Sequence, residues 1–410
     1  MRFLKSFFLL LLGFFVLLSA VGCKESDDEG GGDVVSLQPG DSAARTVLVY
    51  IMGENTLSSN VRSDLNEMVR GAYSIPDSCY LLAFVDDIRL PYICRIYKDV
   101  NGVAVRDTVL KYSEDFYSTD TARFREVVTW VLDEYPSDNF GLVLWSHGSG
   151  WVYDVNRTRS IGVDDGYHKY ENGSYTSKWM EVEELAAVLE SLPVKNDFVL
   201  YDACFMQCVE AAYTMRNAAE WLVGSPAELP GNGAPYDKIM SSLFSFPFNA
   251  DSLIYQYKSG YPEYYGVVLS AIKTSALERL AEITADVVPA YFSRSYIVND
   301  STFSYLPGGS SNGIYPEYCD MNAQMELRLP VELYTMWKMA FDEAVPYKVA
   351  SKRWMSAIKN PRGEYYNVDQ LRYGGVSMFV PRDWAEYFRF NSDFRKTEWY
   401  TVAGWDVTGW

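Results

Sequence analysis

Histidine is scarce in this sequence: the 410 residues contain only two, His147 and His168. A papain-like peptidase needs its histidine downstream of its cysteine, and no histidine follows His168, which argues against that class. Residues 309–313 (GSSNG) match the pattern of a serine nucleophile elbow. Because no histidine follows them and no strand-to-helix context surrounds them, we interpret these residues as a loop.

Cysteine is also scarce. The six cysteines are Cys23, Cys79, Cys94, Cys204, Cys208 and Cys319. This number is far too small for a disulfide scaffold, although a single disulfide is left open. If Cys23 carries a lipid, an odd number remains, and a thiol left over outside the cytoplasm is a candidate reactive group. The spacing of Cys204 and Cys208 with the two histidines fits no common zinc pattern, so we predict no metal site there.

Positive charge is outnumbered by negative charge. The chain has 36 Lys and Arg against 54 Asp and Glu, which gives a formal net charge of -18. No basic stripe is present, so nucleic acid is not an expected partner. An acidic surface steers cationic substrates, though weakly at physiological salt. With 48% hydrophobic residues, the chain has enough apolar side chains for a substantial core, in one large domain or two smaller ones.

The first 22 residues have the features of a signal peptide. Arg2 and Lys5 precede an apolar stretch over 7–21, which is shorter than the roughly 20 residues of a membrane-spanning helix. The small residues before Cys23 resemble a bacterial lipobox, in which the cysteine is acylated and becomes the new N-terminus. An ordinary signal peptide that happens to contain a cysteine is the alternative.

Residues 23–43 are acidic and rich in glycine, which predicts a lipidated, flexible tether. The segment 24–29 (KESDDE) resembles the surface-export signal of Bacteroidetes lipoproteins. We therefore expect an exported lipoprotein that is held at the bacterial outer membrane through a lipid on Cys23. Whether it faces the periplasm or the cell exterior is left open.

Strands and helices alternate over the first half of the remaining chain. Apolar runs typical of buried strands occupy 47–51, 80–85, 140–145, 198–201 and 221–223. Helical spacing predicts helices over 60–72, 122–135, 180–192 and 206–216. This alternation predicts an α/β sandwich around a mostly parallel sheet.

The rest of the chain gives weaker signals. Asn101-Gly102 predicts a hairpin between strands at 93–97 and 103–110. After about residue 250 the pattern loosens, with helices expected over 276–290 and 333–344 and a late strand over 376–380. We expect a catalytic core over 44–245, completed by a helical and strand region over 246–410.

Two side chains with catalytic potential follow neighbouring strands. His147 comes directly after the run 140–145, and Cys204 comes after the run 198–201. Parallel strands linked by a right-handed crossover bring both residues to the same carboxyl edge of the sheet, where α/β proteins carry their sites. The helix expected after Cys204 would lower the pKa of its thiol through the positive helix N-terminus. A buried structural cysteine and a loop histidine are the alternative.

The sequence around these residues resembles the clostripain family of caspase-like cysteine peptidases. The resemblance rests on residues 144–151 (LWSHGSGW) and 202–206 (DACFM), with looser matches at 53–57 (GENTL), 224–233 and 375–381. Ser149 stands where the family has glycine, and Glu54 stands where it has aspartate. The resemblance implies a caspase-like three-layer α/β/α sandwich with a C-terminal extension.

The resemblance also implies catalytic roles. Cys204 would attack the scissile carbonyl as a thiolate, and His147 would protonate the leaving amine. The backbone N–H groups of Gly148 and Cys204 would form the oxyanion hole. The reaction would be endoproteolysis of protein or peptide substrates, with no cofactor required.

A preference for cutting after Arg or Lys is a further implication. An acidic residue at the floor of the substrate pocket would bind that basic side chain. Asp202 matches the family position two residues before the nucleophile, and Glu228 and Asp237 are further candidate substrate-binding acids. For Asp202, a turn former at the end of a strand is the structural alternative.

Some family members cut themselves between the histidine and the cysteine, so self-processing is expected here. Arg157, Arg159, Lys169 and Lys178 lie in that window and are the candidate cleavage sites. Calcium dependence occurs in part of the family, but this sequence has no EF-hand loop, which leaves calcium open.

Two other functions compete with proteolysis. One is a catalytically silent homologue that binds peptides, and the intact His147 and Cys204 argue against it. The other is a glycan-binding surface lipoprotein, since the chain has 11 Trp and 32 Tyr, and aromatic side chains bind sugars. Many of these aromatics lie in apolar runs, where packing explains them.

Overall fold

A mixed β-sheet is the centre of the fold. The computed structural model describes residues 37–152, 160–167, 176–194, 196–295, 303–310 and 315–410. Among them, nine strands form one sheet, in the spatial order β12 (Tyr347–Ala350), β10 (Val268–Lys273), β9 (Ala219–Gly224), β8 (Asn196–Asp202), β5 (Ser137–Trp145), β1 (Ala43–Met52), β2 (Cys79–Asp86), β3 (Tyr92–Lys98) and β4 (Ala104–Lys111). The five strands from β9 to β2 run parallel, and the two pairs at the edges are antiparallel.

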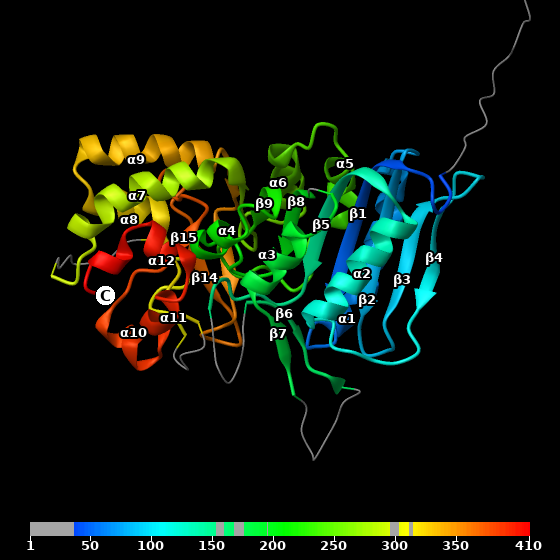
Figure 1. Ribbon diagram of the computed structural model, residues 1–410, viewed down its shortest axis with the longest axis horizontal. Coiled ribbons are helices and arrows are strands. Elements are labelled where there is room, and N and C mark those ends of the chain that lie inside the picture. Colours follow the sequence, from blue (N-terminus) through cyan, green and yellow to red (C-terminus); the bar gives the residue numbers. More distant parts are fainter. Residues whose placement is uncertain (1–36, 153–159, 168–175, 195, 296–302, 311–314) are drawn as a thin grey trace, which may run out of the picture. The chain divides into compact units, whose positions relative to one another are not determined.

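Helices cover both faces of this sheet. One face packs against α2 (Thr121–Glu134), α3 (Val182–Glu190), α4 (Val209–Thr214) and α7 (Leu277–Tyr291), and the other against α1 (Ser58–Gly71), α5 (Tyr236–Leu243) and α6 (Ala250–Ser259). Figure 1 shows α2 and α3 across the near face. The three-layer α/β/α sandwich predicted from the sequence is confirmed.

The alternation of β1 explains why both faces need covering. Leu48 and Tyr50 contribute to the core on one face, and Val47, Val49 and Ile51 contribute to the core on the other. All five side chains are fully buried. Since burying one such side chain stabilises the fold by about 1.5–3 kcal/mol, a strand that is apolar on both sides is stable only between two helix layers.

Local side-chain hydrogen bonds stabilise the start of one helix and the predicted hairpin turn. The Asp120 carboxylate caps α2 by accepting hydrogen bonds from the backbone N–H groups of Ala122 and Arg123, at 3.0 and 3.1 Å. In the hairpin between β3 and β4, Gly102 adopts a left-handed φ of 74°. The Asp99 carboxylate accepts hydrogen bonds from the N–H groups of Asn101 and Val103 and closes that turn.

The predicted division at residue 245 does not coincide with a break in the sheet. Strands β10 and β12 come from the C-terminal region and add to the sheet beyond β9. The loosened pattern after residue 250 does not predict either strand: β12 is a four-residue strand at the edge of the sheet, and β10 lies antiparallel between β12 and β9. The late strand over 376–380 is also shorter than predicted and comprises only β15 (Ser377–Met378), which pairs with β11 (Cys319–Asp320).

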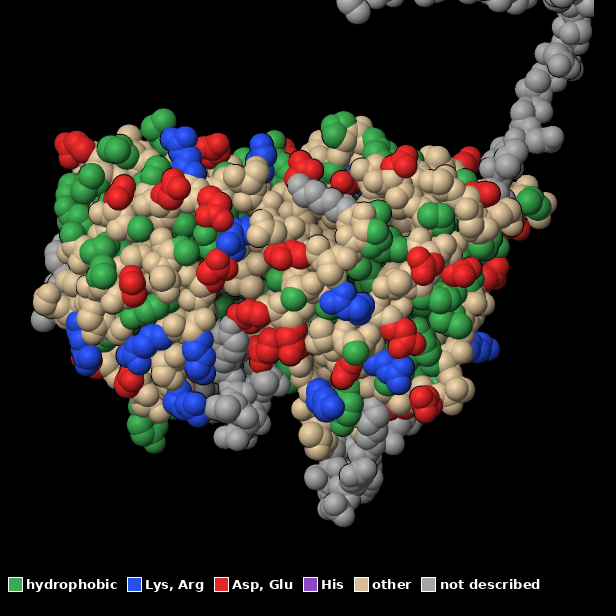
Figure 2. Space-filling model, in the orientation of Figure 1, with side chains coloured by type: hydrophobic (Ala, Val, Ile, Leu, Met, Phe, Trp, Pro, Cys, Tyr) green, Lys and Arg blue, Asp and Glu red, His purple; other side chains and the backbone are tan. Residues whose placement is uncertain are grey.

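The remaining elements surround the sheet. They are β6 (Ile161–Asp164), β7 (Lys178–Met180), β13 (Arg353–Ser356), β14 (Glu364–Asn367), α8 (Met321–Arg328), α9 (Val331–Ala344), α10 (Asp383–Tyr387), α11 (Phe390–Phe394) and α12 (Glu398–Val402). No helix in the described part of the chain is both long and apolar enough to cross a bilayer. On the surface shown in Figure 2, acidic and basic side chains are interspersed, without a large area of one sign.

Candidate active site

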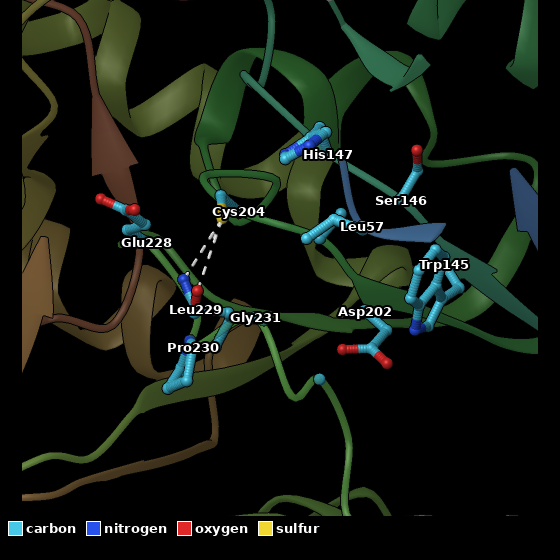
Figure 3. A pocket seen from close by; sticks show the side chains of 12 residues that line it. Leu57, Trp145, Ser146, His147, Asp202, Cys204, Glu228, Leu229, Pro230 and Gly231 are labelled. Atoms are coloured by element: carbon cyan, nitrogen blue, oxygen red, sulfur yellow. Dashed lines mark hydrogen bonds between the residues drawn. The ribbon is translucent and has the colours of Figure 1, made fainter. Parts of the chain in front are cut away.

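His147 and Cys204 line the same cavity, at the carboxyl ends of two adjacent parallel strands. The register pairs Trp145, the last residue of β5, with Asp202, the last residue of β8. The loops that follow β5 and β8 therefore begin at the same carboxyl edge of the sheet, beside each other. The cavity between them has a volume of about 120 Å³ and is shown in Figure 3. It is lined by Leu57, Trp145, Ser146, His147, Asp202, Ala203, Cys204, Glu228, Leu229, Pro230, Gly231 and Gly233.

Glycine allows these two loops to approach each other. A Cβ atom on Gly148 would lie 2.5 Å from the carbonyl oxygen of Cys204, which is closer than real contacts permit. Gly150 has a left-handed φ of 69°, and a Cβ atom there would lie 2.8 Å from the Sγ of Cys208. The glycines that follow His147 are therefore required by the close packing of the two loops.

The thiol of Cys204 lies against the backbone of Leu229, as the dashed lines in Figure 3 mark. The Leu229 N–H donates a hydrogen bond to Sγ at 3.3 Å, and Sγ lies 3.9 Å from the Leu229 carbonyl oxygen. Burial and, to a smaller extent, the nearby Glu228 carboxylate raise the pKa of the Cys204 thiol to about 12, although the Leu229 N–H acts in the opposite direction. The thiol is therefore protonated at neutral pH in this state.

The predicted lowering of this pKa by a helix N-terminus is wrong. Helix α4 begins at Val209 and not directly after Cys204, so the positive end of the helix is not at the sulfur. The intervening residues form a loop in which Phe205 adopts a left-handed φ of 60°. Packing holds this costly backbone conformation in place, because the Phe205 ring stacks on Tyr318 at a centroid distance of 4.4 Å.

His147 is half-buried, and it contacts two other segments of the chain, one at Thr56 and one at Gly162. Its Nε2 lies 2.8 Å from the Oγ1 of Thr56, and its carbonyl oxygen accepts a hydrogen bond from the N–H of Gly162 at 2.9 Å. Burial lowers the pKa of the imidazole, and the Asp165 carboxylate offsets part of that effect. The imidazole is therefore neutral at neutral pH and can accept a proton from a thiol.

Asp202 provides a buried carboxylate at the cavity. It accepts hydrogen bonds from the N–H of Ala234 at 2.9 Å, the Tyr236 hydroxyl at 2.9 Å and the Tyr257 hydroxyl at 3.0 Å. Burial raises the pKa of Asp202, and these three donors oppose the rise. Gly233 has a left-handed φ of 65°, and a Cβ atom there would lie 2.8 Å from an Asp202 oxygen.

The other two candidate acids differ in position. Glu228 lines the cavity, and its carboxylate accepts hydrogen bonds from the Ser356 hydroxyl at 2.6 Å and the Ala357 N–H at 3.0 Å. Asp237 is not among the residues that line the cavity, and its carboxylate lies 3.8 Å from the Nε of Arg70. The structure therefore does not bring Asp237 into the site, because Asp237 lies in the first turn of α5 and faces α1.

The prediction of site residues from the sequence missed Asp64 of α1 and Thr56. The indole N–H of Trp145 donates a hydrogen bond to Asp64 at 2.7 Å, and burial and the Asp202 charge raise the pKa of Asp64 to about 8. A signal for Asp64 was present in the sequence, since an acid three residues after Val61 lies on the apolar face of the predicted helix. No pattern in the sequence indicates the contact between Thr56 and His147.

Five residues named in the sequence analysis lie outside the residues that the structure describes: Cys23, Arg157, Arg159, His168 and Lys169. Lys178 begins β7, and its ammonium group lies 4.1 Å from the ring centroid of Tyr117.

No disulfide joins the five cysteines that the structure describes. Cys208 is the N-cap residue of α4 and is fully buried. Helix α4 therefore begins after both Cys204 and Cys208, and the two cysteines do not lie on one helix.

Comparisons with known proteins agree with this geometry. A sequence model described as the clostripain family matches residues 49–410. A secreted C11 cysteine protease from Bacteroides thetaiotaomicron, solved in complex with an irreversible peptide inhibitor, is 32% identical with a TM-score of 0.76. The match covers 89% of this chain and 99% of that one.

Two further solved structures share the fold. An inactive zymogen C11 protease from Parabacteroides distasonis is 26% identical with a TM-score of 0.74, over 88% of this chain and 99% of that one. Another secreted C11 cysteine protease from Bacteroides thetaiotaomicron, called iotapain, is 18% identical with a TM-score of 0.69, over 88% of this chain and 100% of that one. No curated protein matches the chain.

Proposed function

The chain belongs to the clostripain family of cysteine proteases, and we propose that it is an endopeptidase that cuts after Arg or Lys. Cys204 is the nucleophile, and His147 transfers the proton. The observation that carries the proposal is that both residues line one cavity with the buried carboxylate of Asp202.

Catalysis begins with proton transfer from the thiol to the neutral imidazole. The resulting thiolate attacks the carbonyl carbon of the scissile bond, and the carbonyl oxygen becomes negatively charged. The backbone N–H groups of Gly148 and Cys204 stabilise this oxyanion. The imidazolium of His147 then protonates the leaving amine, and water hydrolyses the acyl-enzyme.

The specificity follows from the charge of the cavity. Asp202 and Glu228 are both acidic and line it, whereas neither Lys nor Arg is among its lining residues. A guanidinium or ammonium group that enters the cavity favours the ionised form of Asp202, because an opposite charge lowers the pKa of a carboxylate. An acidic or apolar side chain would leave the buried carboxylate without a charge partner.

Two further proposals come from the sequence. Self-cleavage occurs between His147 and Cys204, after Arg157, Arg159, Lys169 or Lys178. A lipid on Cys23 holds the protein at the bacterial outer membrane, a proposal that rests on the small residues before Cys23 and the signal-peptide features of residues 1–22. Mass spectrometry of the purified chain tests the first, and metabolic labelling with a fatty-acid analogue tests the second.

The activity is tested with fluorogenic peptides that end in Arg, Lys, Asp or Leu. We expect cleavage after Arg or Lys in the wild-type chain, and no cleavage by the Cys204→Ala variant. The matched control is Cys79→Ala, which removes a thiol at the opposite end of the sheet. Cleavage only after Asp or Leu would contradict the specificity, and activity in Cys204→Ala would contradict the nucleophile.

A further inference from the structure

The hydroxyl of Thr56 lies against the imidazole of His147, with Oγ1 2.8 Å from Nε2. Building on the peptidase function proposed above, we propose that Thr56 is a positioning residue. It accepts a hydrogen bond from the Nε2–H group and so leaves Nδ1 to take the thiol proton. This tautomer matters because a neutral imidazole accepts a proton only at the nitrogen that carries no hydrogen.

A local structural role does not account for the Thr56 hydroxyl. Thr56 lies just before α1, where a hydroxyl can bond the free N–H groups of the first helical turn. The N-cap residue, however, is Leu57, and α1 begins without a capping hydrogen bond from its side chain. Within the described part of the chain, the side chain of Thr56 forms its hydrogen bond with His147.

The buried side chain of Asn55 fixes the loop that carries Thr56. Its Nδ2 donates hydrogen bonds to the carbonyl oxygens of Met52 and Val163, both at 2.8 Å. Its Oδ1 accepts a hydrogen bond from the Leu57 N–H at 2.8 Å. Both neighbours of Thr56 are therefore held in place, and a fixed loop keeps the hydroxyl at one point of the site.

The backbone next to His147 is tied to the same residues. The Oγ of Ser146 donates a hydrogen bond to the Met52 carbonyl at 2.8 Å and accepts one from the Val163 N–H at 3.1 Å. Ser146 therefore shares both of these partners with Asn55. The hydroxyl and the imidazole follow directly after these two residues in the chain, so one hydrogen-bonded framework sets the distance between them.

The hydrogen bond to Thr56 acts at each stage of proton transfer. When Nε2–H donates to the hydroxyl oxygen, the Sγ–H bond of Cys204 can break, its proton moves to Nδ1, and the electron pair remains on sulfur. The imidazolium then carries a hydrogen on both nitrogens, and Thr56 continues to accept from Nε2. The leaving amine later takes the proton from Nδ1, which restores the starting tautomer. In the opposite tautomer, Nδ1 would already carry a hydrogen.

Nitrogen NMR of the imidazole rings tests the tautomer without any substrate. The chain has only two histidines, so ¹⁵N-histidine labelling of a chain without a histidine tag gives signals from His147 and His168 alone. The variant His168→Gln assigns them. At a pH where the ring is neutral, we expect His147 to carry its hydrogen on Nε2 in the wild type and to populate both tautomers in Thr56→Val. A hydrogen on Nδ1 in the wild type, or an unchanged tautomer in Thr56→Val, would overturn the proposal.

Kinetics with a peptide ending in Arg test whether the hydrogen bond acts in catalysis. Thr56→Val replaces the hydroxyl with a methyl group of similar size. We expect kcat to fall about tenfold with KM nearly unchanged, because a single neutral hydrogen bond has a modest effect and this one acts on proton transfer. Thr56→Ser keeps the hydroxyl and should restore most of kcat.

The matched control is Thr335→Val, the same substitution at an exposed threonine of α9 whose hydroxyl donates a hydrogen bond to the Val331 carbonyl at 2.7 Å. It should retain the wild-type kcat. The proposal is overturned if Thr56→Val matches this control, or if Thr56→Ser is as impaired as Thr56→Val. A chain that cleaves no peptide would contradict the peptidase function instead, and the NMR result would still decide the tautomer.

Discussion

At the residue scale, the state of the Cys204 thiol is the main constraint on the mechanism. Its raised pKa and the lowered pKa of His147 make the resting pair neutral, not a thiolate–imidazolium pair. A basic substrate side chain changes this balance, because its positive charge near Asp202 and Glu228 cancels the field that disfavours the thiolate. The specificity pocket and the nucleophile are therefore coupled by electrostatics.

The first prediction concerns Glu228. The Glu228→Gln substitution removes a negative charge near Cys204, so the pKa of the thiol should fall and the thiolate fraction at a fixed neutral pH should rise. We expect alkylation by iodoacetamide to accelerate several-fold, measured by mass spectrometry of the Cys204 peptide. Asp133→Asn, a distant acid, is the control. An unchanged rate in Glu228→Gln would contradict the coupling.

The second prediction concerns the pH dependence set by His147. Its imidazole must be neutral to accept the thiol proton, and burial places its pKa below 6.5. As the pH falls through that lowered pKa, the imidazole becomes protonated and kcat/KM should fall. The acid limb should therefore have its midpoint below 6.5, measured with an Arg peptide over a range of pH. A midpoint above 6.5 would contradict the burial of a neutral imidazole.

At the element scale, the close approach of the loops after β5 and β8 gives the third prediction. The methyl group of Gly148→Ala would overlap the Cys204 carbonyl and push the two loops apart. We expect kcat/KM to fall by about 100-fold, with a loss of stability of about 1–3 kcal/mol.

The matched control for this prediction is Gly260→Ala. A Cβ atom there lies 2.7 Å from the side chain of Pro235, outside the cavity. It should lower stability without a comparable loss of activity. Equal activity losses in the two variants would show that Gly148 has only a packing role.

The elements also show which parts of the site the sequence predicts. The apolar runs at 140–145 and 198–201 correctly predict two strands, and their parallel pairing places His147 and Cys204 at one edge. The helix after Cys204 is predicted to begin at residue 206, whereas α4 begins at Val209. The loop around Phe205 depends on long-range contacts, since its N–H donates a hydrogen bond to Ala227 and its ring stacks on Tyr318. The spacing of apolar residues along the chain indicates local secondary structure and gives no information on contacts between distant segments.

The same reason explains the other differences. Strands β10 and β12 are short and form an antiparallel edge, so their signal is weak compared with that of the buried parallel strands. Asp237, in contrast, is close to the site in sequence but faces Arg70.

At the scale of the whole molecule, the C-terminal region completes both the sheet and the active site. Ser356 donates a hydrogen bond to Glu228, and the Ser377 N–H donates one to the Gln207 carbonyl at 3.0 Å. The buried ring of Tyr318 also supports Phe205. The cavity therefore rests on residues from both sides of the predicted boundary at 245.

The fourth prediction follows from this arrangement. A chain that ends at residue 245 loses β10, β12 and α7, and it exposes apolar residues of β9 and α4 that these elements cover. We expect such a chain to be inactive and to lack a cooperative thermal transition by circular dichroism. A cooperative transition near that of the full chain would contradict the view that 246–410 is integral to the fold.

The central claim is that Cys204 is a nucleophile in a pocket that selects basic side chains. The most direct test is labelling with two peptidyl ketones that alkylate catalytic cysteines and differ only in a terminal Arg or Asp, followed by peptide mapping. The account predicts that the Arg probe modifies Cys204 and not the other cysteines, that the Asp probe leaves it largely unmodified, and that Asp202→Asn reduces the difference. Equal labelling by both probes, or labelling of a different cysteine, would contradict it.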